Sequence, residues 1–165
     1  MSPFDVLNRG RAIPLTWVYG DVLDANKLVS SLEETLSLFP SLAGRYGKRP
    51  CIRCSNVGVP VDFGTLPTLQ CPSDEGESFA VFERNDHEAT CPKKAGMDPD
   101  PCDETTPLLA IKVTTALDGS GTAIGLLVQH GVCDMNGAMA FARAWSKVCL
   151  LRGSNSGSKW SLPST

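Results

Sequence analysis

The chain has 165 residues, of which 42% are hydrophobic and 20% charged, a composition typical of one globular domain with a sizeable buried core. Its formal net charge is −3, with acidic and basic residues interspersed, which argues against a nucleic-acid or membrane-surface partner. The N-terminal segment carries Asp5 and lacks the apolar core of a signal peptide, and no window is apolar enough for a membrane span. We therefore expect a cytoplasmic protein whose cysteines are reduced.

The first part of the sequence predicts a strand, a helix and a group of short strands. Residues 12–20, "AIPLTWVYG", are rich in β-forming residues and end in glycine. Leucines recur at helical spacing over 24–40, which predicts a helix with Asp24 as its N-cap and Pro40 as its stop. Glycine, proline and asparagine then interrupt residues 41–64, which favours short strands.

The middle of the chain is irregular and rich in cysteine. Residues 66–106 predict a long surface excursion. Cys51 and Cys54 form a C-x-x-C pair, and Cys91 and Cys102 could complete a zinc site with them. The usual zinc signature has two tight pairs, so free thiols are favoured and we predict no metal site.

A hairpin is the clearest feature of the last part. Residues 108–117 predict a strand, "DGSG" a turn, and residues 122–129 the partner strand. In the partner strand, alternate apolar residues share one face, and a period of two places His130 next on that face.

A helix is expected after the hairpin, over residues 136–151, with Asn136 as its cap. The Gly/Ser-rich residues 153–165 are typical of a linker. We therefore expect one domain over residues 1–152, followed by a linker-like tail. The apolar face of the helix comprises Ala138, Phe141, Ala142, Trp145, Val148 and Cys149.

His130 stands where the strand gives way to the helix, with Asp134 four positions later. A histidine with one free ring nitrogen can act as a general base, because the ordinary pKa of histidine, about 6.5, leaves the neutral form abundant. Asp134 could fix the tautomer of the ring, or lock the loop by pairing with a distant arginine. Gly131 and Gly137 would let the backbone turn tightly and approach a ligand. The alternative is a satisfied loop histidine followed by a helix-capping aspartate.

Three segments, in this order, resemble motifs of one family, the plant-type BAHD acyltransferases. "SPFD" at Ser2–Asp5 resembles the family's N-terminal motif, and "LEETLSLFPSLAGRY" at Leu32–Tyr46 resembles its "YPLAGR" segment. The run from Pro107 to Gly153 resembles the active-site segment, with two strands, H-x-x-x-D, and a helix that contains "AW".

The resemblance implies an α/β (α+β) fold: a mixed β-sheet with flanking helices, one half of a chloramphenicol acetyltransferase-like two-domain fold. It implies an acyltransferase, transferring groups other than aminoacyl groups, that moves an acyl group from acyl-CoA to a hydroxyl or amine. His130 would be the general base and Asp134 a structural residue of the catalytic loop. Acyl-CoA would be a co-substrate, with no permanently bound cofactor and no metal.

The sequence also departs from the family pattern. The second half's "DFGWG" motif is absent, and "DFGTL" at Asp62–Leu66 lies upstream of the histidine and lacks the Trp-Gly. We therefore expect a fragment whose activity is incomplete, unless a homo-oligomer or a partner chain supplies the missing half. The alternative function is a non-catalytic binding or regulatory half-domain with the same fold. Neither the acyl donor nor the acceptor is specified.

Overall fold

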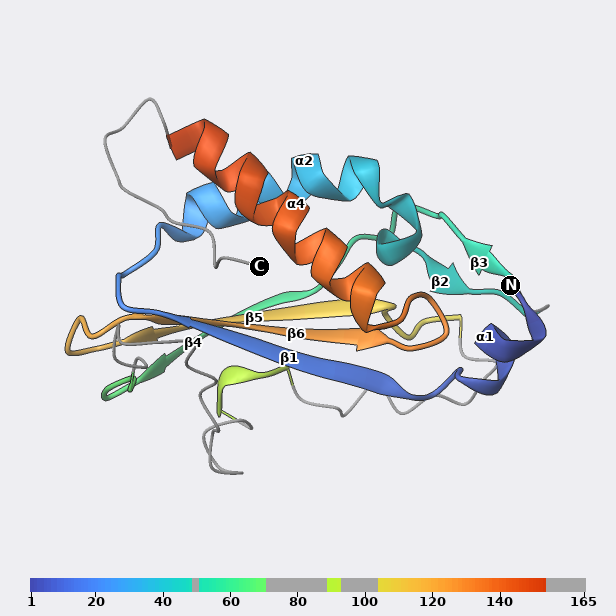
Figure 1. The fold of residues 1–165 in the computed structure, drawn as a ribbon, viewed down its shortest axis with the longest axis horizontal. Helices are drawn as coiled ribbons and strands as arrows, with labels where there is room; N and C mark the ends of the chain where they lie inside the picture. The colour runs from blue at the N-terminus through green and yellow to red at the C-terminus, as the bar shows by residue number, and fades with distance from the viewer. Residues whose placement is uncertain (49–50, 71–88, 93–103, 154–165) are drawn as a thin grey trace.

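The computed structural model describes residues 1–48, 51–70, 89–92 and 104–153, which form a mixed sheet with two helices packed on one of its faces (Figure 1). The sheet has the order β1-β6-β5-β4, with β4 parallel to β5 and the other neighbours antiparallel. This architecture confirms the predicted fold class. The strands of the sheet are β1 (Ala12–Tyr19), β4 (Val61–Leu66), β5 (Leu109–Ala116) and β6 (Thr122–Gln129). The remaining elements are α1 (Pro3–Leu7), α2 (Ala25–Leu38), the 3₁₀ helix η1 (Pro40–Ala43), the small pair β2 (Arg45–Tyr46) and β3 (Ile52–Arg53), and α4 (Met135–Gly153).

The predicted hairpin is confirmed as β5 and β6. The two strands pair antiparallel, with Leu109 opposite Val128 and Thr115 opposite Thr122. The turn between them needs Gly119, whose φ of 79° is a left-handed conformation that residues with a side chain rarely adopt. The "DFGTL" segment is β4, at the edge of the sheet.

Helix α2 begins and ends where the sequence predicts. The Asp24 side chain accepts hydrogen bonds from the amides of Asn26 and Lys27, at 2.8 and 3.1 Å, which satisfies two donors at the helix N-terminus. Pro40 cannot continue the helix because it has no amide hydrogen, and it starts η1 instead.

Helix α4 begins one residue earlier than predicted, and Asn136 is not its cap. The helix starts at Met135, and the Asp134 side chain accepts a hydrogen bond from the Gly137 amide at 2.9 Å. Asp134 therefore occupies the capping position, and Asn136 lies within the first turn. Either side chain could cap a helix, so the choice depends on where the preceding turn places the chain.

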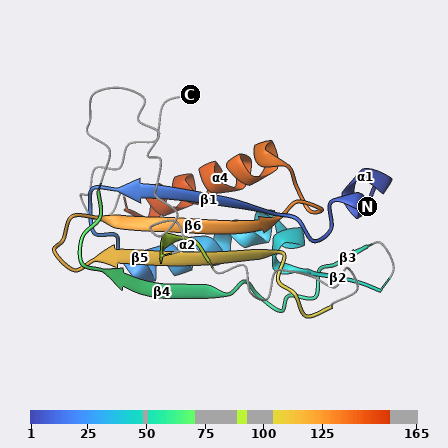
Figure 2. The ribbon, with the colours of Figure 1, turned by 90° about the horizontal axis from the view of Figure 1, so that it is seen from below.

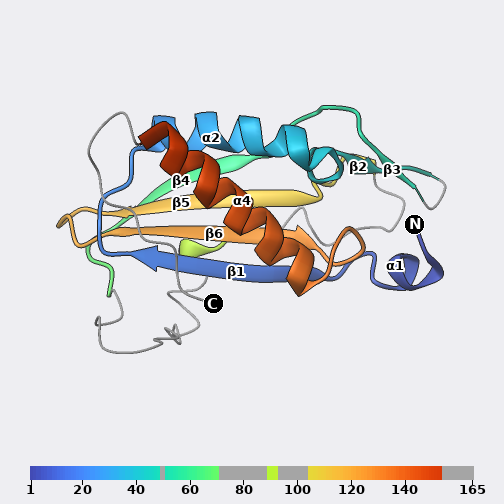
Figure 3. The ribbon, with the colours of Figure 1, turned by 45° about the horizontal axis from the view of Figure 1, so that its top comes forward.

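The core lies between the sheet and the two helices. Figure 2 shows the sheet from the side opposite the helices, and Figure 3 shows α4 crossing it diagonally while α2 runs alongside β4 and β5. Trp145 joins the helices, since its indole N–H donates to the Leu28 carbonyl at 3.2 Å and to Ser31 Oγ at 3.0 Å. This agrees with the prediction that Trp145 is a core residue. The buried members of this core include Leu28, Leu32, Ile111, Val113, Ile124, Leu126, Val128, Ala138, Phe141 and Trp145.

Part of the predicted surface excursion is buried instead. Thr90 and Cys91 lie against the sheet face opposite the helices, with exposed fractions of 0% and 5%. Their backbone approaches so closely that a Cβ on Gly125 would stand 2.2 Å from the Thr90 carbonyl oxygen. The rest of the excursion, residues 71–88 and 93–103, and the predicted tail after Gly153 lie outside the described residues. None of the helices in the described ranges is long and apolar enough to cross a membrane.

Candidate active site

His130 directly follows β6, and its backbone is fixed by the neighbouring strand. Its amide donates to the carbonyl oxygen of Arg11, at 2.7 Å, just before β1 begins. The antiparallel pairing of β1 with β6 therefore extends to His130 itself. The residue is half-buried, and its imidazole makes no hydrogen bond or ion pair within the part of the chain that the structure describes. An imidazole held by its backbone, with unengaged ring nitrogens, can accept a proton from an incoming group.

Asp134 acts on the helix rather than on the histidine. Its Oδ1 accepts from the Gly137 amide at 2.9 Å, and its carbonyl oxygen accepts from the Ala138 amide at 3.0 Å. Within the described ranges it pairs with neither His130 nor an arginine, the two roles that the sequence left open. The carboxylate is exposed, and it anchors the end of the turn by capping α4.

Gly131, in the turn, and Gly137, in the first turn of α4, are sites of close packing. A Cβ on Gly131 would lie 2.7 Å from Tyr46 Oη and 2.8 Å from the Asp5 carbonyl oxygen. A Cβ on Gly137 would lie 2.6 Å from the Cβ of Cys133. Distances below 3.0 Å leave no space for a side-chain carbon, so protein groups already occupy the place of a Cβ at both glycines. The approach of a ligand to the backbone at these glycines stays a prediction.

The three segments that resemble one family meet at this turn. Asp5 belongs to "SPFD", and Tyr46 ends the "LAGRY" segment. The Asp5 carbonyl oxygen and Tyr46 Oη are the two atoms nearest to the place of a Cβ on Gly131. Figure 1 shows α1 and β2 at the end of the sheet where α4 begins. The Arg9 guanidinium lies 4.3 Å from the centre of the Tyr46 ring, and its Nη2 donates to the Gly47 carbonyl at 3.1 Å.

The sequence interpretation missed Arg9 and Tyr46. Tyr46 lies inside a matched segment, which was the only signal available, and nothing in the spacing linked it to a turn more than eighty residues later. The Asp5 side chain is hydrogen-bonded to Ser2, and the backbone hydrogen bond from Ser2 lowers the pKa of that carboxyl below its ordinary value. This local hydrogen bond lies at the N-terminus of α1.

Arg45 is a structural residue of the β2 segment. It is 8% exposed, and its guanidinium donates to three backbone carbonyls. These carbonyls belong to Thr105, Gly44 and Gly58, at 3.1, 2.8 and 3.1 Å. The side chain thus ties the β2 segment to the chain that enters β5.

The cysteines proposed as an alternative zinc site are not brought together where they are described. Cys51 and Cys54 are exposed, whereas Cys91 is buried against the sheet, where burial raises the pKa of its thiol to about 11. Cys102 lies outside the described residues. Among the residues that are described, no group of three or more His, Cys, Asp or Glu side chains could hold a metal ion.

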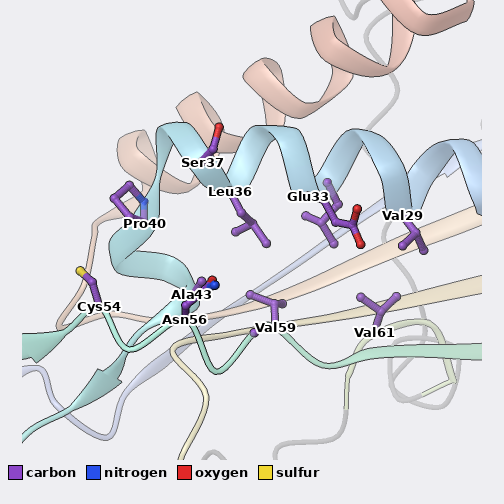
Figure 4. A pocket seen from close by; sticks show the side chains of 12 residues that line it. Val29, Glu33, Leu36, Ser37, Pro40, Ala43, Cys54, Asn56, Val59 and Val61 are labelled. Atoms are coloured by element: carbon purple, nitrogen blue, oxygen red, sulfur yellow. The ribbon is translucent and has the colours of Figure 1, made fainter.

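A groove of about 490 Å³ lies elsewhere, between α2, η1 and the chain leading into β4 (Figure 4). Its walls are mostly apolar, with Glu33 and Asn56 among the polar members. None of its lining residues belongs to the turn that carries His130, so the groove and this turn are separate features. The lining residues are Val29, Leu32, Glu33, Leu36, Ser37, Pro40, Ala43, Cys54, Asn56, Gly58, Val59 and Val61.

Comparisons with known proteins give a consistent result. A family model described as "Transferase family" matches residues 18–159. The chain is 32% identical over 125 residues to an acetyl-CoA-benzylalcohol acetyltransferase of Clarkia breweri, covering 75% of this chain and 27% of that protein. It is 27% identical over 181 residues to a BAHD acyltransferase of Arabidopsis thaliana, covering 94% of this chain and 35% of that protein.

A solved structure agrees with these relatives. The crystal structure of vinorine synthase superposes with a TM-score of 0.63 and 25% sequence identity, covering 90% of this chain and 37% of that one. The chain therefore spans about a third of the length of the proteins that it matches.

Proposed function

The chain belongs to the Transferase family of BAHD-type acyltransferases, as an N-terminal part with the chloramphenicol acetyltransferase-like fold, and on this premise we propose that His130 is the general base of an acyl transfer. The acyl donor is an acyl-CoA thioester, and the acceptor is a hydroxyl or amine. The name of the Clarkia breweri relative pairs acetyl-CoA with an alcohol, which supports this substrate class. The observation that carries the proposal is the half-buried imidazole after β6, with its backbone held by Arg11 and its ring unengaged within the described ranges.

The proposed reaction balances with His130 as the only proton carrier. The neutral imidazole takes the proton from the acceptor O–H or N–H as the oxygen or nitrogen bonds to the thioester carbonyl carbon. The resulting tetrahedral oxyanion collapses, the C–S bond breaks, and the CoA thiolate takes the proton from the imidazolium. The products are an ester or amide and free CoA, and the imidazole is neutral again.

Asp134 has a supporting role in this proposal. By capping α4, its carboxylate fixes the far end of the turn that starts at His130. A base contributes most when its geometry is set before substrate arrives, so a stable turn favours proton transfer. The acidic member of the motif thus acts on the backbone and does not exchange protons with the ring.

The proposed activity of this chain by itself is slow. Each donor that stabilises a tetrahedral oxyanion is worth about 10²–10³ in rate, and the chain spans only about a third of its relatives. We therefore expect slow acyl transfer, or slow hydrolysis of the thioester when water replaces the acceptor. A second copy or a partner chain that completes the site would raise the rate.

The test measures release of CoA from acetyl-CoA by the purified chain, with and without benzyl alcohol. Free CoA should be separated by chromatography, because the seven cysteines of the chain would consume a thiol reagent. We expect release above the buffer rate, and a loss of about 10²–10⁴-fold of that excess in His130→Ala. The matched control is His87→Ala, which changes the only other histidine of the sequence and should retain activity.

Equal CoA release from the wild type and from folded His130→Ala contradicts the proposal. A chain that runs as a monomer, shows no acetyl-CoA binding by calorimetry and captures a partner protein would instead support the non-catalytic half-domain. Circular dichroism of each variant establishes that the comparison is made between folded chains.

A further inference from the structure

We propose that Tyr46, held in place by Arg9, is a positioning residue that fixes the turn after His130. The inference rests on the proposed function in one respect, since it takes His130 to be the reacting group. Its structural content is independent: the orientation of the His130 ring depends on a tyrosine and an arginine that are distant in the sequence.

The first observation is the lack of space at Gly131, the residue next to His130. A Cβ there would stand 2.7 Å from Tyr46 Oη and 2.8 Å from the Asp5 carbonyl oxygen. Gly131 is not among the residues with positive φ, so its backbone conformation does not itself require glycine. The turn is therefore pressed against Tyr46 and Asp5, and glycine is needed there because these groups approach so closely.

The second observation is that Tyr46 cannot easily move. Its side chain is fully buried, and the Arg9 guanidinium covers its ring at 4.3 Å from the ring centre. Arg9 is itself anchored to the Gly47 carbonyl. A ring fixed in this way presents its oxygen to Gly131 at a constant place, so the tyrosine acts as a rigid stop for the turn.

The third observation is that the Tyr46 hydroxyl is buried without a hydrogen bond in the described ranges, which ordinary core packing does not explain. Tyr46 Oη has no hydrogen-bond partner among the residues that the structure describes. Burial raises the pKa of this phenol to about 12, so the group stays neutral, yet an uncompensated hydroxyl in the interior costs free energy. No hydrogen bond within the described residues therefore explains this hydroxyl, and its oxygen occupies the place that a Cβ on Gly131 would need.

The same N-terminal segment holds His130 from the other side. The Arg11 carbonyl accepts the His130 amide, while Asp5 and Arg9 lie around Gly131 and Tyr46. Two successive residues of the turn are therefore fixed by contacts that come from residues 5–11 and from β2. We therefore expect the half-buried ring of His130 to keep one preferred direction, because the backbone on both sides of its Cα is held.

The test reads the His130 ring directly by NMR of the full chain. The imidazole Cε1–H signals of the two histidines are assigned with His87→Gln, which removes one of them. In Tyr46→Phe, we expect the His130 signal to shift or broaden, while the free energy of unfolding stays equal or rises because an unpaired hydroxyl is removed. If Tyr46 were only a structural residue, Tyr46→Phe would not change the His130 signal while leaving the free energy of unfolding equal or higher.

A pair of compensating substitutions sharpens the test. Gly131→Ala adds a methyl group against Tyr46 Oη and should shift the His130 signal further, with a loss of about a hundredfold in CoA release. The double variant Gly131→Ala/Tyr46→Phe removes the oxygen that the methyl group meets, and we expect the signal to return part of the way to wild type. Gly64→Ala is the matched control, because a Cβ there meets Lys112 Cε at 3.4 Å, an ordinary contact.

The proposal is overturned if Tyr46→Phe and Gly131→Ala both fold and leave the His130 signal unchanged. It is also overturned if the double variant is no closer to wild type than Gly131→Ala. Should Gly131→Ala fail to fold, Tyr46→Phe alone decides between the outcomes. If His130→Ala keeps full CoA release, the proposed function fails, while the NMR result on Tyr46 still stands or falls by itself.

Discussion

His130 and Asp134 belong to one motif but are held by different contacts. The histidine is fixed through its backbone amide, and the aspartate is fixed by the first turn of α4. Their spacing in the sequence is therefore a spacing along one turn, in which one residue ends a strand and the other starts a helix. The proton transfer proposed for His130 therefore takes place without the Asp134 carboxylate at its ring.

Replacing the cap tests this division at the residue scale. Asp134→Ala should lower the free energy of unfolding by about 1 kcal/mol, because the Gly137 amide loses its acceptor. Asp134→Asn is the matched control, since an asparagine oxygen can also cap a helix, and it should stay close to wild type. Urea unfolding of the three chains measures the difference. Equal stability of the alanine and wild-type chains would show that the cap is not important for the fold.

Among the elements, β6 has the most constrained surroundings. It pairs with β1 on one side and β5 on the other, and all of its residues are buried. One face contributes to the core beneath the helices, and the opposite face receives Thr90 and Cys91. The strand that leads to His130 is thus enclosed on both faces and both edges, which makes it a rigid base for the turn.

The tight face of β6 gives a prediction for the element. Gly125→Ala should destabilise the fold by about 1–3 kcal/mol, because its Cβ would stand 2.2 Å from the Thr90 carbonyl oxygen and the backbone there must move. In the matched control Gly64→Ala, on the edge strand β4, we expect no loss of stability. Thermal and urea unfolding measure both. A Gly125→Ala chain as stable as Gly64→Ala would mean that the approach of the 89–92 segment is not maintained in solution.

Over the whole molecule, two thiols and one phenol are buried in their neutral, protonated forms. Burial raises the pKa values of the Cys91 and Cys133 thiols to about 11 and that of the Tyr46 phenol to about 12. These groups come from different parts of the chain, since Cys91 lies under the sheet and the other two lie near the turn after β6. Ionisation of any of these groups therefore destabilises the folded chain relative to the unfolded chain.

This arrangement predicts that stability falls at alkaline pH. Below the ordinary thiol pKa of 9.0, folded and unfolded chains both keep the Cys91 proton. Between pH 9 and about 11 the unfolded chain loses it while the folded chain retains it, so the free energy of unfolding decreases as the pH rises. Denaturant unfolding at a series of pH values should show this decrease. It should be shallower in Cys91→Ala and unchanged in the exposed Cys54→Ala, and equal slopes in all three chains would contradict it.

Local side-chain patterns were enough to predict most of the helices and strands, and the motifs were enough to predict the family. β1, α2, β5, β6 and the helix after them follow from side-chain periodicity, turn glycines and capping residues, which act over a few neighbouring positions. The motif pointed to His130 and Asp134 as candidate residues because those residue types suit proton transfer and loop geometry. The start of α4 was misplaced, because both Asp134 and Asn136 are good caps and nothing local chooses between them.

The surroundings of the candidate base depend on long-range packing. The parallel pairing of β4 with β5, the burial of Thr90 and Cys91, and the meeting of Asp5, Tyr46 and Gly131 join residues that are far apart in the chain. Such contacts depend on how whole elements pack, and a single sequence carries no periodic signal for them. Tyr46 illustrates the limit: its place in the sequence predicts a short strand, while its role comes from an arginine above its ring and a glycine at its hydroxyl.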